Sequence, residues 1–235
     1  MASTLADNRA AIDSNKLARR WFSPATFGLV RAAEDAICAA ATGQLLDVGC
    51  GSMPYRAAVL DTGASYTGLD IEARTNGVEF IGSATDMHLV ADASFDTVLC
   101  SEVLEHVAEP RVALAEMARV LRNDGKVILT VPFLGRLHEE PYDYYRYTEH
   151  GIRALLADSG FAVESMETTG SVFSLLGHQL SSVFVVAAWR VPMLRWVALG
   201  LNGLLFVAPS RLADRLLGPI RRKLPLGYVV TARRI

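Results

Sequence analysis

The chain has 235 residues, of which 51% are hydrophobic and 20% charged, a balance that fits a globular domain with extra apolar surface. Only three cysteines occur and none forms a CxxC pair, which argues against a disulfide framework and against a zinc site. Residues 1–170 carry 14 Lys and Arg against 24 Asp and Glu, a net −10, whereas residues 171–235 carry 9 against one acid, a net +8. The acidic body argues against nucleic acid as a ligand, and the basic C-terminal part is typical of contact with an anionic lipid or substrate.

The N-terminal segment is polar and carries charges of both signs. Residues 1–22 lack the apolar stretch of a secretory signal, which predicts a protein that stays in the cytoplasm. Apolar positions with few breakers over residues 8–40 predict two helices around the turn at Ser23-Pro24. We expect residues 1–42 to form N-terminal helices on the lid or substrate side of the protein.

Short apolar segments alternate with helical segments from residue 44 onward. The expected strands cover 44–49, 65–71, 78–82, 95–101, 126–133 and 160–170, and the expected helices cover 54–61, 111–121 and 148–158. Thr148 is a suitable N-cap for the last of these helices. The alternation predicts an α/β fold with a Rossmann-like, mostly parallel sheet that is covered by helices on both faces. In such a sheet the ligand lies outside the carboxyl ends of the strands, where the crossovers diverge.

The loops after the first, second and fourth strands are therefore the candidate binding loops. Gly49 and Gly51 allow the backbone to approach a ligand closely, and Asp47 stands at the end of the first strand. Asp70, about 20 residues after the first loop, is placed to accept both hydroxyls of a ribose. Pro54 removes an amide where a pyrophosphate would need a donor, so a cofactor with a ribose but no pyrophosphate fits better.

Four motifs together carry a family resemblance. They are "LLDVGCG" at 45–51, "YTGLD" at 66–70, "GSATDMHLVADASFDTVLCSEVLEHV" at 82–107 and "RVLRNDGKVILTVP" at 119–132. With them, the sequence resembles the class I S-adenosylmethionine-dependent methyltransferases over about residues 43–168. The resemblance implies a seven-stranded sheet whose last strand, here residues 225–235, is antiparallel to the others. Met53 stands where a third glycine is commoner in the family.

The resemblance also implies the cofactor, S-adenosyl-L-methionine, its product, S-adenosyl-L-homocysteine, and the residues that bind it. The methionine end is expected at Asp47, Gly49, Cys50, Gly51, Ser101 and Glu102, the ribose at Asp70, and the adenine at Ile71, Asp86 and the backbone amide of Met87. The residues alone leave other readings open. Asp47 could cap a turn, Asp86 could be a surface acid, and Glu102, Glu105 and His106 could form only a helix start with a solvated face.

The connector after the fifth strand, residues 132–151, is dense in side chains that can perform chemistry. Methyl transfer to oxygen needs a base, and His138 is the predicted one because its ordinary pKa lies near neutrality. Asp143 could orient that imidazole or act as the base itself. No two histidines have the spacing of a ligand pair, so we predict no metal.

The same connector is expected to bind the acceptor. Arg146 could clamp an acidic group, and Tyr142, Tyr144 or Tyr145 could line the acceptor pocket. The "H..P.D..RYT" pattern looks like a subset of these methyltransferases, many of them associated with surface-polysaccharide or lipid-linked metabolites. The alternative is that Asp143 and Arg146 form an internal ion pair.

Residues 171–224 form an apolar and basic insertion between the core at 43–170 and the last strand. Its apolar runs are shorter than the roughly 20 residues that a spanning helix needs. Helices lying on an anionic membrane are one interpretation, and a lid or a homodimer interface is the other. The first interpretation predicts a peripheral protein on the inner face of the membrane.

Three functions from different classes follow from the sequence. The leading one is a methyltransferase that acts on a small-molecule, sugar or lipid-linked acceptor, most often at oxygen. A nicotinamide-dependent oxidoreductase would share Asp70, but the first loop lacks GxGxxG. A non-catalytic cofactor-binding or membrane adaptor protein is the third.

Overall fold

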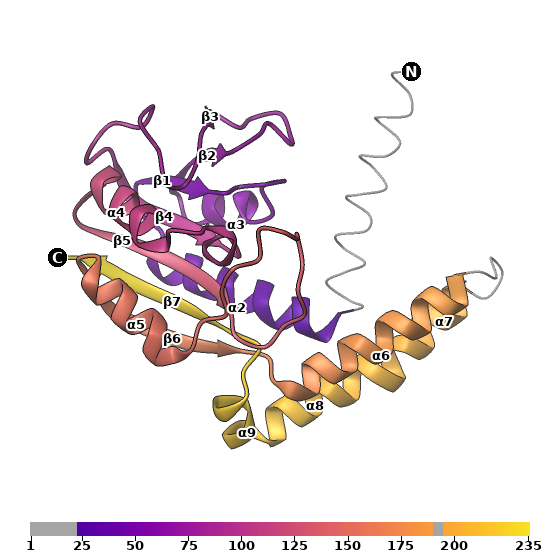
Figure 1. Cartoon of the computed structure of the whole chain (residues 1–235). Helices are drawn as coiled ribbons and strands as arrows, with labels where there is room; N and C mark the ends of the chain where they lie inside the picture. The colour runs from indigo at the N-terminus through magenta and orange to yellow at the C-terminus, as the bar shows by residue number, and fades with distance from the viewer. Residues whose placement is uncertain (1–22, 190–194) are drawn as a thin grey trace, which may run out of the picture. The chain divides into compact units, whose positions relative to one another are not determined.

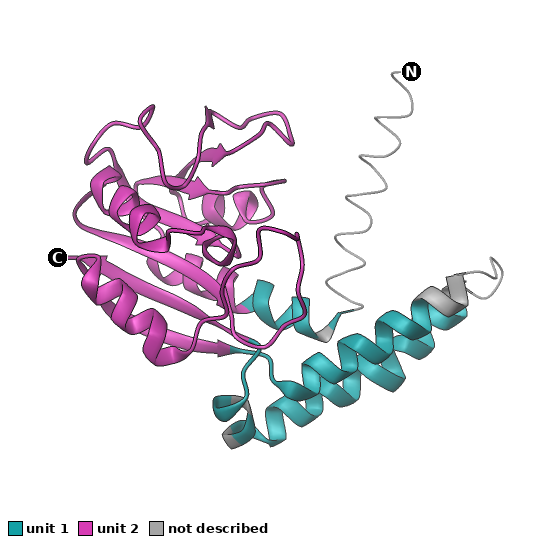
Figure 2. Cartoon of the chain, in the orientation of Figure 1, with its two compact units in different colours: residues 1–31, 169–226 teal, residues 32–168, 227–235 magenta. Residues whose placement is uncertain are grey.

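A computed structural model describes residues 23–189 and 195–235 of the chain. Contacts divide the chain into two compact units, one of residues 1–31 and 169–226 and one of residues 32–168 and 227–235 (Figure 2). The helix expected within residues 8–22 lies outside the described residues. The second expected N-terminal helix is α2 (Pro24–Ala40).

The second unit holds the predicted seven-stranded sheet, in the order β3-β2-β1-β4-β5-β7-β6. The strands are β1 (Gln44–Val48), β2 (Ser65–Asp70), β3 (Phe80–Ile81), β4 (Phe95–Ser101), β5 (Leu121–Pro132), β6 (Phe161–Thr169) and β7 (Gly227–Arg234). Strands β1 to β5 pair in parallel, and β7 pairs antiparallel with β5 from Lys126↔Arg233 to Pro132↔Gly227. The expected Rossmann-like sheet with an antiparallel last strand is confirmed.

Strand order places the topological switch between β1 and β4. The chain leaves β1 for β2 and β3 on one side and returns to β4 on the other side (Figure 1). Because crossovers diverge there, the loops after β1 and β4 can hold a ligand between them. The strands place the candidate binding loops at this switch.

Alternation of buried side chains explains how helices cover both sheet faces. In β1, Leu46 and Val48 belong to the cluster that also includes Leu114 of α4 (Pro110–Val120) and Ile152 of α5 (Glu149–Asp158). Helices α4 and α5 lie on one face of the sheet, and α3 (Arg56–Asp61) lies on the other (Figure 1). A short 3-10 helix, η1 (Leu104–His106), follows β4. As predicted, the Thr148 side chain caps α5, because its hydroxyl accepts a hydrogen bond from the Gly151 amide at 3.0 Å.

Strand β5 is longer than the sequence pattern predicts. It begins at Leu121 rather than at Lys126, directly after α4, and Leu121 pairs with Phe95 before a bulge restores the register. The sequence did not predict a strand start at Leu121, because the polar residues Asn-Asp-Gly at 123–125 have low strand propensity. Pairing with β4 holds these residues in the sheet.

The first unit is helical. It contains α6 (Val172–Trp189), α7 (Arg195–Asn202), the π-helix η3 (Gly203–Val207), α8 (Ala208–Leu216) and α9 (Gly218–Lys223). Hydroxyls of Ser171 and Ser174 donate to the Asp214 carboxylate, so the single acid of this segment is bonded inside the unit. Among the residues that the structure describes, no helix has the length and apolar character needed to cross a membrane.

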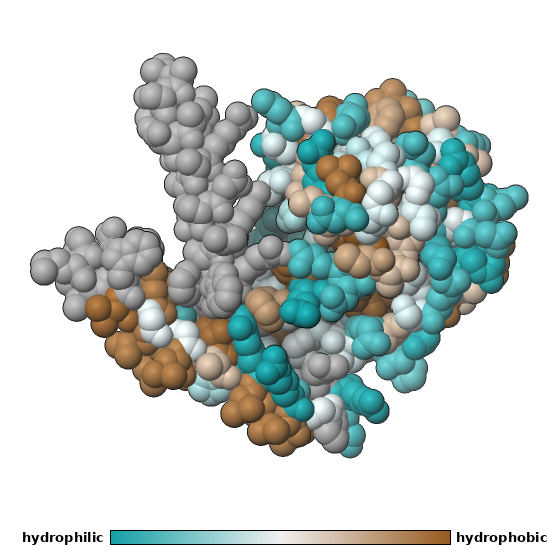
Figure 3. Space-filling view, turned by 180° about the vertical axis from the view of Figure 1, so that it is seen from behind, coloured by the Kyte–Doolittle hydropathy of each residue, from teal (hydrophilic) through white to brown (hydrophobic). Residues whose placement is uncertain are grey.

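Apolar side chains gather on the outer surface of these helices. Figure 3 shows hydrophobic residues along α6 and α8. Exposed apolar residues of this unit include Leu176, Leu180 and Val183 on α6, Val197 on α7, Leu204 and Leu205 on η3, and Leu212 and Leu216 on α8. On α6 they are spaced by four and three residues and therefore form one stripe.

Candidate active site

A cavity of about 360 Å³ lies at the switch point, within the unit that holds the sheet. Its walls come from the loops that follow β1, β2 and β4 and from the connector after β5. Predicted site residues on these walls are Gly49, Gly51, Asp70, Ile71 and Glu102, and further lining residues are Arg74, Ser83, Thr85, His106 and Tyr144. Half of the ten predicted cofactor residues thus line one cavity.

The β1 loop is bent by two glycines with positive φ, 72° at Gly49 and 52° at Gly51. A Cβ at Gly49 would overlap the Val103 side chain, whereas the position at Gly51 is open. The Gly51 amide donates to Asp70 Oδ2 at 2.7 Å, and the Glu72 amide lies 3.3 Å from Asp70 Oδ1. A carboxylate has about four acceptor sites, so Asp70 keeps acceptors for a ribose while it holds the loop.

Asp47 lies behind this loop rather than on the cavity wall. Its side chain is 2% exposed and accepts a hydrogen bond from the Tyr66 hydroxyl at 2.6 Å. Burial raises the pKa of Asp47 to about 7, against the lowering effect of the Tyr66 bond, and the charge of Asp70 adds to the rise. Asp47 is therefore placed to support the β1 loop indirectly, by holding the end of strand β1 in position. Cys50 is also buried, and its amide donates to the Leu69 carbonyl at 3.0 Å.

The residues predicted to hold the adenine do not all lie on the cavity wall. Ile71 is exposed and lines the cavity. The exposed Asp86 carboxylate pairs with His88 at 3.0 Å instead. The Met87 amide, predicted to meet the ring, donates to Glu116 Oε2 at 2.8 Å, so its donor is already engaged. Ser83 and Thr85 lie on the wall at this end, where the sequence gave no signal for them.

The β4 loop carries backbone strain. Glu102 has a φ of 52°, which is uncommon for a residue with a side chain and clusters at functional sites. Its amide donates to the Thr130 hydroxyl, and that hydroxyl donates to Glu102 Oε1, both at 3.0 Å. Burial raises the pKa of Glu102, and the bond from Thr130 partly offsets the rise. Ser101 lies beside this pair, with its hydroxyl 2.9 Å from that of Thr130.

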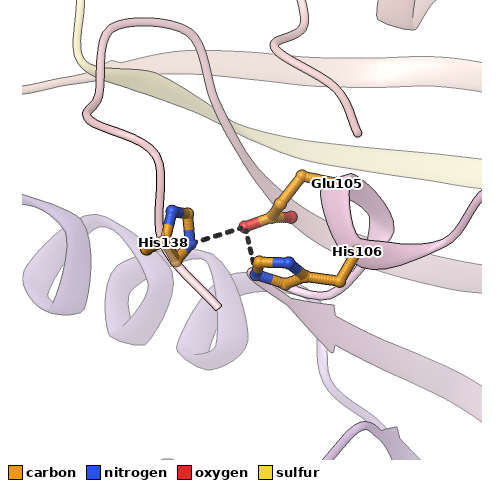
Figure 4. A group of neighbouring side chains, drawn as sticks. All are labelled: Glu105, His106 and His138. Atoms are coloured by element: carbon orange, nitrogen blue, oxygen red, sulfur yellow. Dashed lines mark ion pairs between the residues drawn. The ribbon is translucent and has the colours of Figure 1, made fainter. Parts of the chain in front are cut away.

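Three side chains meet next to the cavity wall: Glu105, His106 and His138 (Figure 4). Glu105 and His106 come from η1, and His138 comes from the connector after β5. His106 Nε2 lies 3.7 Å and His138 Nε2 lies 4.0 Å from Glu105 Oε1. The two rings are in edge contact, with centroids 4.7 Å apart. This group could hold a cation or transfer a proton.

Glu105 is the unusual member of this group. Its side chain is 0% exposed, and neither carboxyl oxygen has a hydrogen-bond partner among the described residues. Burial raises its pKa to about 9, and the nearby charge of Glu102 adds to the rise. A buried, unpartnered carboxyl is costly and indicates a functional site.

Asp143 and Arg146 form the internal ion pair that the sequence left as an alternative. The Asp143 side chain is 1% exposed, and its oxygens lie 2.6 and 2.7 Å from the Arg146 guanidinium. The guanidinium holds the pKa of Asp143 well below its usual range, so this carboxylate is a poor proton acceptor. Arg146 also donates to the carbonyls of Arg136 and Tyr145, both at 2.8 Å. The pair thus positions the connector, and the His138 amide donates to Asp143 at 2.9 Å.

The connector tyrosines differ in their placement. Tyr144 lines the cavity, whereas Tyr142 is exposed and Tyr145 donates its hydroxyl to the Ala108 carbonyl at 2.8 Å. Tyr147 is buried, and its hydroxyl donates to the Leu104 carbonyl.

Sequence reasoning gave little weight to Glu105 and His106. A signal was present, since Glu102 and Glu105 are three residues apart and could share a helix face. Their convergence with His138 needed the fold.

The family model described as "Methyltransferase domain" matches residues 46–129, which begin within β1 and include the candidate loops and β4. Over these residues the chain is similar to the class I S-adenosylmethionine-dependent methyltransferases. This match covers the cavity walls formed after β1, β2 and β4, and it ends before the connector that carries His138. The resemblance carried by the four motifs is thereby confirmed.

Relatives of this chain include the ubiquinone biosynthesis O-methyltransferase of Xanthomonas oryzae pv. oryzae (strain PXO99A). That protein is 33% identical over 100 residues, which are 37% of this chain and 42% of the relative. The match thus spans about two fifths of the length of the curated relatives.

Solved structures share the fold over more of the chain. The 1,6-didemethyltoxoflavin-N1-methyltransferase of Burkholderia thailandensis, solved with S-adenosylhomocysteine, has a TM-score of 0.56 and 19% identity and covers 97% of this chain and 89% of its own. The [4+2]-cyclase SpnF has a TM-score of 0.55 and 18% identity over 86% and 80%. At such identities the likeness concerns the fold alone.

Proposed function

We propose that this protein transfers a methyl group from S-adenosylmethionine to an oxygen of a small-molecule or lipid-linked acceptor. The observation that carries the proposal is the cavity at the switch point, where Asp70 both orients the β1 loop and keeps acceptors for a ribose. The family match and the curated O-methyltransferase relatives support it. The β1 loop of this chain lacks the GxGxxG pattern, and Pro54 has no amide to donate to a pyrophosphate, which makes a nicotinamide-dependent oxidoreductase the weaker candidate.

The residues of the cavity fit this cofactor, and each has a separate role in the proposed reaction. When bound, the cofactor supplies an electrophilic methyl group on a sulfonium. Gly49 and Gly51 keep the β1 loop free of side chains, and Asp70 orients the ribose. Tyr144 and His106 line the same cavity and would border the acceptor. We assign removal of the acceptor's proton to the group of Glu105, His106 and His138.

Asp70→Asn tests cofactor binding directly. The amide retains an oxygen for the Gly51 amide but loses the charge and acceptor capacity that the ribose hydroxyls use. We expect the Kd for S-adenosylhomocysteine, measured by titration calorimetry, to rise about 10- to 100-fold, because bonds to charged groups contribute roughly 1.5–3 kcal/mol.

Asp61→Asn is the matched control, since Asp61 is exposed at the end of α3 and does not line the cavity. Its affinity for S-adenosylhomocysteine should equal that of the unmodified protein. Equal affinities for both variants would overturn the assignment of Asp70. Binding of reduced nicotinamide dinucleotide without any binding of S-adenosylhomocysteine would favour the oxidoreductase.

We further propose that residues 171–224 bring the enzyme to an anionic membrane. Support comes from the exposed apolar stripe of Leu176, Leu180 and Val183 and from the basic residues near α8 and α9. Asp214, the one acid of this segment, is bonded to two serines within the unit, and the segment as a whole carries a net positive charge. A net positive charge repels a second copy of the segment and attracts anionic lipid, which makes a homodimer the weaker interpretation.

Vesicle binding tests this docking. We expect the protein to co-sediment with vesicles of anionic lipid, and we expect binding to fall as salt is raised from low to physiological ionic strength. Val183→Glu should weaken binding about tenfold, because a charge enters the apolar stripe. Val112→Glu, an exposed valine of α4 in the other unit, is the control and should bind normally. Absence of binding, with a dimer in sedimentation, would instead indicate a subunit interface.

A further inference from the structure

Hydrogen bonds fix the orientation of both imidazoles in the group of Glu105, His106 and His138. His106 Nδ1 lies 3.0 Å from the Tyr142 carbonyl, and a carbonyl only accepts, so Nδ1 carries the proton. His138 Nδ1 lies 3.3 Å from the Arg136 carbonyl and 3.4 Å from Asp143 Oδ2, closer than the donor Arg146 Nη2 at 3.5 Å. Both Nε2 atoms therefore present lone pairs.

These two lone pairs face a third acceptor. Each Nε2 lies next to Glu105 Oε1, and the Glu105 carboxyl is buried with no hydrogen-bond donor among the described residues. At 3.7 and 4.0 Å neither contact is a hydrogen bond, so the buried carboxyl and the two ring nitrogens do not satisfy one another, and a cation between them would bind all three. Carbonyl and carboxylate partners on Nδ1 are the usual outer contacts of metal-binding histidines.

The spacing of the three atoms suits one ion. Ligands at about 2.1 Å from a tetrahedral ion lie roughly 3.4 Å apart. The Nε2–Oε1 distances of 3.7 and 4.0 Å are a few tenths of an ångström longer, and all three ligand atoms lie within 4.8 Å of one another. Small rotations of the two rings would close that difference.

We infer that Glu105, His106 and His138 bind a divalent cation of the zinc and cobalt class. Two imidazoles and one carboxylate select this class over magnesium and calcium, which prefer oxygen ligands. The three ligands leave a coordination position open, and His106 lies on the wall of the cavity. The role that we give to this cation rests on the proposed function.

In that role the cation would activate the acceptor for the proposed methyl transfer. Proton removal, assigned above to this group, would then be indirect: a hydroxyl of the acceptor at the open position would have its pKa lowered by the cation held on the three side chains, and would release its proton to solvent before the oxygen attacks the methyl group. The new bond joins this oxygen to the methyl carbon, and the carbon–sulfur bond breaks with its electron pair on sulfur. The acceptor is thus of the hydroxyl class, phenolic or sugar-like, rather than an amine.

Metal titration of the full chain, after treatment with a chelator, tests the site without the reaction. We expect calorimetry with Zn²⁺ to show one site of micromolar or tighter affinity, and Co²⁺ to give the visible bands of a low-coordinate ion. His138→Ala and Glu105→Gln should each weaken binding at least about tenfold. His138 lies on a partly exposed connector, so its variant should fold, and circular dichroism verifies this. His88→Ala is the matched control, because His88 is an exposed histidine outside the group and should leave binding unchanged.

The outcomes separate the two proposals. Equal Zn²⁺ affinity for His138→Ala and the unmodified protein, or preference for Mg²⁺ over Zn²⁺, would overturn the inference. Binding of S-adenosylhomocysteine without any metal binding would overturn the cation site and leave the proposed methyl transfer intact. Conversely, Asp70→Asn should lose cofactor affinity and keep the Zn²⁺ affinity, which would support both assignments.

Discussion

Replacing Glu105 with leucine is expected to stabilise the metal-free protein by about 1–3 kcal/mol and to lower methyl transfer by at least about 100-fold. The Glu105 carboxyl is fully buried and its oxygens have no partner among the described residues, so an apolar side chain of similar size removes a desolvation cost. The same substitution removes a ligand or proton acceptor from the group with His106 and His138. Urea unfolding after chelator treatment measures the first effect, and release of S-adenosylhomocysteine with hydroxyl acceptors measures the second.

Glu105→Gln is the control that separates the two effects. The amide retains a buried polar group, so its stability should lie within about 1 kcal/mol of the unmodified protein while activity falls. A leucine variant that unfolds at lower urea than the unmodified protein would contradict the prediction. That result would mean that the carboxyl has a stabilising partner in solution.

Gly49→Ala is expected to cost about 2–4 kcal/mol of stability and to weaken S-adenosylhomocysteine binding at least about tenfold. The φ of 72° at Gly49 penalises any side chain, and its Cβ would also overlap Val103 on the opposite loop. Both loops line the cavity, so their displacement changes the position of the ligand. Urea unfolding and calorimetry measure the two effects.

Gly63→Ala is the matched control for backbone strain. Gly63 has a φ of 85°, but a Cβ there meets open space, and it does not line the cavity. Only the left-handed penalty of about 1 kcal/mol should appear, with unchanged cofactor affinity. A loss of stability equal to that of Gly49→Ala would show that the contact with Val103 has no role.

The sequence by itself predicted the architecture because local patterns carry it. Buried parallel strands need continuous apolar residues, so "LLDV" in β1 and "KVILTV" in β5 could be predicted as strands from the sequence. The helix cap at Thr148 could be predicted in the same way. Strand order then predicted that Gly49, Gly51 and Asp70 meet at one end of the sheet. The start of β5 at Leu121 was missed, because pairing with β4 overrides the low strand propensity of residues 123–125.

Only the tertiary structure decided which side chains of the connector face the site. Tyr144 rather than Tyr142 lines the cavity, and Asp143 is paired with Arg146. The Met87 amide donates its hydrogen bond to Glu116. The tertiary structure also brought His138 to within 4.0 Å of Glu105, although 32 residues separate them in the sequence. Connector residues have no periodicity that assigns a direction, so their side chains are positioned by long-range contacts. The burial of Glu105 likewise depends on the η1 turn and the connector packed against it, since Tyr144 and Tyr145 donate their amides to its carbonyl.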